Sequence, residues 1–120
     1  MAYNYDRITQ EANAAGVAAV KKSGVKPHPF GCGWGWVQVP LPPKPAKSGL
    51  ATWMKYRNGN EGCDWGHGYG GNGGFSYHFK QYGQSADQAY IHAEAFAAYV
   101  NEVCKDDPGT PAVSAQSKLD

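Results

Sequence analysis

The stretch Cys-Gly-Trp-Gly-Trp-Val-Gln-Val at residues 32–39 decides the fold expected for this chain of 120 residues. Side chains of a strand alternate between its two faces, so a strand here has one large, mixed face: Cys32, Trp34, Trp36 and Gln38. The other face is small or β-branched: Gly33, Gly35, Val37 and Val39. Glycine within a strand marks close approach of another backbone or of a ligand. We predict that an Ala-rich helix covers the glycine face; a ligand there is the alternative.

Two amphipathic helices are predicted around this strand. In residues 5–22, Ile and Ala recur at helical spacing between a suitable N-cap, Asn4, and a suitable stop, Gly24. In residues 86–105, a capping box that begins at Ser85 precedes a long apolar stripe. The first helix is the Ala-rich one, and its small side chains would let it approach a neighbour closely.

The remaining segments are shorter. Alternation predicts a strand at 75–80 with three aromatic residues on one face, and a last short strand fits 112–116. Residues 48–58 fit a short helix or a strand, and we choose the helix because Ser48 is a good N-cap. Residues 58–74 are rich in glycine and are expected to form a long loop.

These elements predict an α+β fold. The whole chain, 1–120, forms one small domain in the order α-β-α-β-α with a C-terminal strand, and the helices pack on one face of a small sheet. The tail, 107–120, is compatible with an ordered or a frayed end.

The composition argues against several classes of protein. Only 18% of residues are charged, which is not typical of a disordered chain. No apolar run approaches the roughly 20 residues that span a bilayer, and the first ten residues lack the pattern of a signal peptide. Three cysteines argue against a disulfide framework. We therefore expect a cytoplasmic protein that does not associate with membranes.

The net charge of +1 is unevenly distributed. No Asp or Glu occurs between residues 12 and 60, a stretch with seven basic residues: Lys21, Lys22, Lys26, Lys44, Lys47, Lys55 and Arg57. The second half of the chain is acidic. The basic stretch predicts a positive face for an anionic ligand; lysines scattered over the fold are the alternative.

Aromatic and basic residues together suggest a binding site. Aromatic rings stack on bases while cations hold phosphate, which is how nucleotides and single strands are bound without catalysis. The candidate ligand-binding residues are Trp34, Trp36, Trp53, Lys55, Arg57, Tyr69 and His78. The alternative for the tryptophans is a place in the core.

Catalytic and metal signatures are weak. Cys63 and His67 are the best pair for a metal or a nucleophile, with Asp64 beside them, but zinc sites usually show paired ligands such as Cys-x2-Cys. A Gly-rich loop is also a poor support for catalytic geometry. We expect no catalytic residues, no bound metal and no cofactor.

Several short stretches together resemble a family of small, uncharacterised bacteriophage proteins. They are Gly31-Cys32-Gly33-Trp34-Gly35-Trp36-Val37-Gln38-Val39, the Gly-rich approach to Phe75, Gln84-Ser85 leading into Ala93-Glu94-Ala95-Phe96-Ala97, and Ser117-Lys118-Leu119-Asp120. The Gly-rich insert around His67 departs from the pattern. The resemblance implies a phage accessory protein, located in the cytoplasm of the bacterial host, and implies no catalytic residue.

The resulting hypothesis is a non-enzymatic binding protein of phage type that sequesters or blocks an anionic, nucleotide-like ligand and so counters host defence. Nucleic acid is a further candidate ligand. One alternative is a protein–protein inhibitor of a host enzyme or nucleoprotein complex, in which exposed aromatic residues form the contact. A homo-oligomer formed through the same patch and a small metal-dependent hydrolase are the others.

Overall fold

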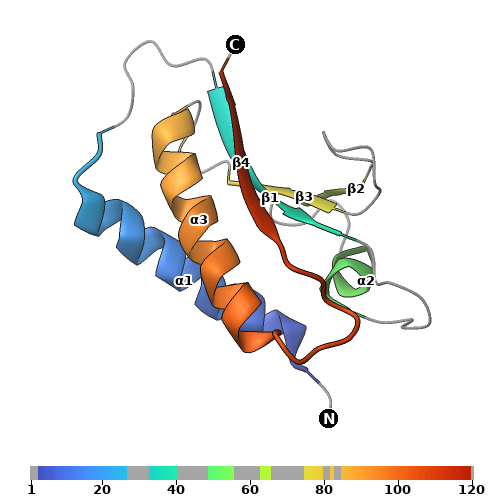
Figure 1. Ribbon diagram of the computed structural model, residues 1–120. Coiled ribbons are helices and arrows are strands. Elements are labelled where there is room, and N and C mark those ends of the chain that lie inside the picture. Colours follow the sequence, from blue (N-terminus) through green and yellow to red (C-terminus); the bar gives the residue numbers. More distant parts are fainter. Residues whose placement is uncertain are drawn as a thin grey trace.

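The computed structural model describes residues 3–26, 33–40, 49–55, 63–65, 75–79, 82 and 85–119. These residues form three helices, α1 (Tyr5–Ser23), α2 (Leu50–Lys55) and α3 (Ala86–Val103). They also form four strands, β1 (Gly33–Val39), β2 (Cys63–Trp65), β3 (Phe75–His78) and β4 (Ser114–Leu119). The fold is therefore α+β, as predicted, with helices and sheet in separate layers (Figure 1).

The sheet is antiparallel and has the order β2-β3-β1-β4. β1 lies in the middle, between β3 and the C-terminal strand β4. Because β3 and β4 both run antiparallel to β1, they are parallel to each other, and α3 connects them by passing over β1 (Figure 1). The short strand β2 adds an edge beside β3.

The helix α3 lies directly on the glycine face of β1. A Cβ atom built on Gly35 would lie 2.8 Å from the carbonyl carbon of Ala89 and from the amide nitrogen of Tyr90. The close approach predicted from the glycines is therefore confirmed, but the helix was predicted wrongly. Helix α3 makes the contact, and the Ala-rich helix α1 packs mainly across α3 (Figure 1).

Three of the predicted helix ends are confirmed by their caps, whereas α3 ends at Val103, two residues before its predicted end. The side chain of Asn4 accepts a hydrogen bond from the amide of Arg7, and Gly24 ends α1 with a φ of 70°. This left-handed conformation favours glycine. Ser85 accepts a hydrogen bond from the amide of Gln88 at the start of α3.

Three further segments differ from their predictions, and the first is β3, which ends at His78 where the strand was predicted to continue to residue 80. The structure has the strand β2 within residues 58–74, which were predicted to be a loop, because Cys63–Trp65 pair with β3. The rest of that segment lies outside the described residues. The last strand begins at Ser114 instead of residue 112 and pairs with β1 through Leu119, so this part of the tail 107–120 is ordered.

The core lies between the sheet and the helices. It combines residues of all three helices with the inward face of the sheet, with Val37 and Val39 from β1 and Phe96 from α3 at its centre. Residues 50 and 54 of α2, Leu and Met, are fully buried in it, so the predicted short helix is confirmed as a core element. No helix in the described ranges is long and apolar enough to cross a membrane.

Candidate functional site

The sheet face turned away from α1 and α3 is the candidate binding surface, here called the outer face. The backbone register assigns to it the alternate positions of the strands: Trp34, Trp36 and Gln38 of β1, Asp64 of β2, Ser76 and His78 of β3, and Ser114, Gln116 and Lys118 of β4. Trp36 lies opposite His78 on one side and opposite Gln116 on the other. Trp34 lies opposite Lys118.

Polar pairing continues along this face. The Ser76 hydroxyl donates to Oε1 of Gln38 at 3.0 Å, across the β1–β3 pair. Ser76 is 7% exposed and Trp36 is 3% exposed. Trp36 is therefore a packed part of the outer face, and its ring is not open for stacking as the binding prediction required.

The structure brings together three of the predicted ligand-binding residues. Trp34, Trp36 and His78 occupy neighbouring positions of the outer face. Trp53 does not join them, because it belongs to α2 and packs against the core between sheet and helices. Lys55 is the last residue of α2.

Other parts of the predicted site lie beyond the structure's description. Arg57 and Tyr69 lie outside the described residues. So does His67, the proposed partner of Cys63, which is the first residue of β2. No three His, Cys, Asp or Glu side chains gather into a metal site among the residues that were described.

The basic residues of this stretch that the structure describes do not gather on one face. Lys21 and Lys22 are exposed at the C-terminal end of α1. Lys55 ends α2, which lies on the opposite side of the molecule from that end of α1 (Figure 1). The alternative of scattered lysines therefore describes these three residues better.

Sequence reasoning missed the contribution of β4. Gln116 and Lys118 belong to the outer face because β4 pairs with the Trp-bearing strand. The alternation of residues 114–118 was available in the sequence, but nothing local indicates which strand becomes the neighbour of β1.

A second polar cluster is buried between α1, α3 and β3. His92 of α3 is 0% exposed. Its Nδ1 lies 2.6 Å from the Tyr82 hydroxyl and its Nε2 lies 3.0 Å from Oδ1 of Asn13, while Nδ2 of Asn13 donates to the Tyr77 hydroxyl at 3.1 Å. The amide oxygen of Asn13 can only accept, so the consistent assignment protonates Nε2, and Tyr82 donates to Nδ1.

The surroundings of His92 keep it neutral. Burial lowers the pKa of His92 from 6.5 to about 4. A Cβ atom on Gly16 would lie 2.5 Å from the imidazole ring, and the ring of Phe79 packs at a centroid distance of 4.1 Å. An imidazole enclosed in this way connects helices and does not reach a substrate.

A third cluster surrounds Asp107, just after α3. Its Oδ2 accepts hydrogen bonds from the hydroxyls of Tyr5 at 2.5 Å and Thr110 at 2.6 Å, and its Oδ1 accepts from the amide of Gly109 at 3.0 Å. Burial alone would raise the pKa of Asp107, but these hydrogen bonds outweigh it and lower the pKa. Oγ1 of Thr110 in turn accepts from the amide of Leu50 at 3.1 Å, so the cluster joins α1, α2 and α3.

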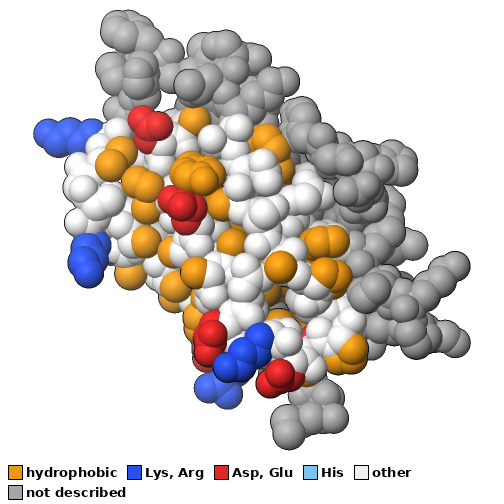
Figure 2. Space-filling model, in the orientation of Figure 1, with side chains coloured by type: hydrophobic (Ala, Val, Ile, Leu, Met, Phe, Trp, Pro, Cys, Tyr) orange, Lys and Arg blue, Asp and Glu red, His pale blue; other side chains and the backbone are white. Residues whose placement is uncertain are grey.

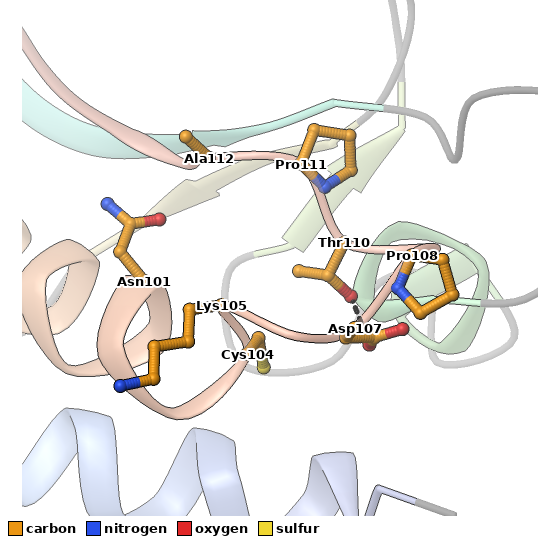
Figure 3. A pocket seen from close by; sticks show the side chains of 8 residues that line it. All are labelled: Asn101, Cys104, Lys105, Asp107, Pro108, Thr110, Pro111 and Ala112. Atoms are coloured by element: carbon orange, nitrogen blue, oxygen red, sulfur yellow. Dashed lines mark hydrogen bonds between the residues drawn. The ribbon is translucent and has the colours of Figure 1, made fainter.

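A hollow of about 390 Å³ opens beside this cluster, between the end of α3 and the approach to β4 (Figure 3). Its polar groups are occupied within the chain: Asn101 bonds the backbone of Val113 in both directions, and Lys105 pairs with Glu102. Burial and the nearby Asp107 raise the pKa of Cys104 to about 11, so its thiol stays protonated and is a poor nucleophile at neutral pH. The hollow is a junction of the fold and not a second candidate site.

Comparison with models of protein families found no match, and neither the curated proteins nor the solved structures yielded one.

Proposed function

We propose that this protein is a non-enzymatic binding protein and that the outer face of its sheet holds an anionic, nucleotide-like ligand. One observation carries the proposal: two tryptophans and a histidine occupy adjacent positions on the sheet face turned away from α1 and α3. A face of this kind offers flat aromatic groups on a rigid support, which suits a base.

The register suggests which part of the ligand each side chain would bind. Trp34 and His78 flank the packed Trp36, so stacking is assigned to these two. Lys118, opposite Trp34, is the cation assigned to phosphate. The amides of Gln38 and Gln116 lie on the same face and can bond a base edge or a ribose.

The proposed protein acts by binding alone, because a nucleotide held on the outer face is no longer free for the host. A protein of phage type that holds such a ligand would remove a nucleotide or a nucleotide-derived signal from the host without changing it. No bond is formed or broken in this scheme, so the ligand is recovered intact.

The experiment is a titration monitored by Trp fluorescence, with mono-, di- and cyclic nucleotides at low and moderate salt. We expect a saturable change for one of them, weakened by salt. Because a stacked base contributes about 1–3 kcal/mol, Trp34→Ala should raise Kd by at least about fivefold. Trp53→Ala is the matched control, since Trp53 packs on the other side of the sheet.

A second pair of variants tests the cation. Lys118→Ala should weaken binding and reduce its salt dependence, whereas Lys22→Ala, at an exposed position of α1, should change neither. The binding proposal is wrong if no nucleotide changes the fluorescence, and turnover of a bound nucleotide would contradict its non-enzymatic part. In the first case a protein–protein inhibitor becomes the leading alternative, to be tested by a pull-down of host proteins.

A further inference from the structure

The strand β4 forms one of the two edges of the sheet that the described residues build. It pairs with β1 along all six of its residues, and no other strand among the described residues pairs with its second edge. An edge strand presents a row of backbone N–H and C=O groups that can pair with another chain. The side chains of Ser114, Gln116 and Ser117 are exposed along it.

This edge has only one of the features that usually prevent pairing, the lysine at position 118. Proteins protect edges with proline, bulges, charged residues or very short strands. The register from Ser114 to Leu119 is unbroken, and the strand contains no proline and no acidic residue. Its one charged residue is Lys118. The other edge, β2, has only three residues, so β4 is the better surface for pairing.

The neighbouring helix favours a second copy of this chain as the occupant. Helix α3 packs on both β1 and β4. Because α3 packs on both strands, it lies over the gap between β1 and β4. If a second β4 pairs at the usual spacing of about 4.8 Å between strands, the two α3 helices are two strand spacings, or about 10 Å, apart on the same side of the joined sheet. This is close to the ordinary distance between packed helices, about 8–10 Å. With this spacing, both the sheet and the layer of α3 helices can continue across the interface.

The surface beside β4 is compatible with such a contact. Asn101 of α3 bonds Val113 just before β4, so the flank of α3 that faces the strand includes Asn101 and, one and two turns earlier, Ala97 and Glu94. Of these, Glu94 alone is charged. Figure 2 shows few charged side chains over the middle of this side of the molecule, with hydrophobic groups between them.

We propose that two copies of the chain associate through antiparallel pairing of their β4 strands, which joins the two sheets into one. An antiparallel pair of identical strands has twofold symmetry, so both copies use the same groups and the assembly closes at a dimer. The interface involves the strand edge and the flank of α3, and it does not include the outer face of either copy. The dimer does not depend on the proposed ligand.

Sedimentation of the full chain from about 1 μM to about 1 mM tests the proposal over the range of weak to moderate affinities. We expect the mass to change from that of one chain, 12.9 kDa, to twice that value. Amides on the free edge of β4 should gain protection from hydrogen exchange over the same range. A monomer at every concentration overturns the proposal.

Charge variants at Ser117 identify the interface. Because β4 has only six residues, any antiparallel register that pairs nearly all of them brings Ser117 close to Ser117 of the second copy. Ser117→Lys alone and Ser117→Glu alone should each raise the dimer Kd by up to about fivefold through like-charge repulsion. An equimolar mixture of the two should form a heterodimer.

The matched controls are Ala18→Lys and Ala18→Glu, at an exposed position of α1. These should dimerise like the wild type, alone and mixed. If Ser117 variants dimerise as well as the wild type while remaining folded by circular dichroism, the interface lies elsewhere and the proposal is wrong.

Discussion

Helix α1 is held by two polar clusters that differ in charge. Near its N-terminus, Tyr5 donates to the carboxylate of Asp107, an ionised group with three hydrogen-bond donors. In its middle, Asn13 bonds His92, a neutral imidazole with no charged group among the hydrogen-bond and ring contacts that it makes. Both clusters bury polar groups that water would otherwise hydrate, but only one buries a charge. The comparison shows that the same helix is stabilised in different ways at these two clusters, with different responses to mutation and to acid.

The largest effect is expected at the neutral cluster. His92→Ala removes a fully buried ring and leaves Tyr82 and Asn13 without this partner, so the free energy of unfolding should fall by about 3–5 kcal/mol. Chemical denaturation measures it. Glu102→Ala, on an exposed position of the same helix, is the control and should change stability by less than about 0.5 kcal/mol. Equal effects of the two variants would show that the buried cluster does not hold α1.

The next effect is the pH dependence of that cluster. His92 takes up a proton near pH 6.5 in the unfolded chain but only near pH 4 in the fold, so the unfolded state binds more protons between these values. Stability should therefore decrease by about 3 kcal/mol as the pH falls from 6.5 to 4. Denaturation at a series of pH values measures this slope. His92→Phe cannot titrate, and a slope unchanged in this variant would assign the effect to other groups.

The smallest effect is expected at the charged cluster. Asp107→Asn keeps the shape of the side chain but replaces an acceptor oxygen by a donor, so stability should fall by about 2 kcal/mol. Its pH signature also differs. Because the pKa of Asp107 is lowered in the fold, its contribution is present above the ordinary value of 3.8 and is lost below it.

The two clusters should lose their contributions to stability at different pH values, which tests whether they act separately. In the wild type, the loss due to His92 should precede the loss due to Asp107 as the pH falls. In Asp107→Asn the second loss should be absent while the first remains. If the variant instead loses the slope between pH 6.5 and 4, the two clusters do not act separately.

Sequence reasoning recovered the elements whose signals are local. Asn4, Gly24 and Ser85 mark helix ends by their own backbone and side-chain chemistry, and the structure has caps at each of them. The alternation around Trp36 likewise gave the correct division of β1 into two faces. These features depend on neighbours in the chain, so the sequence carries them directly.

Features set by distant residues were missed. The burial of His92 depends on residues far along the chain: the absence of a side chain at Gly16 makes room for its ring, and Asn13 and Tyr82 supply its hydrogen bonds. Trp53 was grouped with the other tryptophans because of its residue type, although its helix packs it against the core. Helical spacing shows which residues share a face, but not which layer of the fold that face meets.

The position of β1 has a consequence for the order of folding. Both of its neighbours in the sheet, β3 and β4, come later in the chain, and the second of them comprises residues 114–119. The central strand therefore has no neighbouring strand until much of the polypeptide has been synthesised, and until then β1 cannot form its part of the sheet. Pairings between such distant segments are slow to form. Refolding should accordingly be slower than that of a helical bundle of similar length, which stopped-flow Trp fluorescence would reveal.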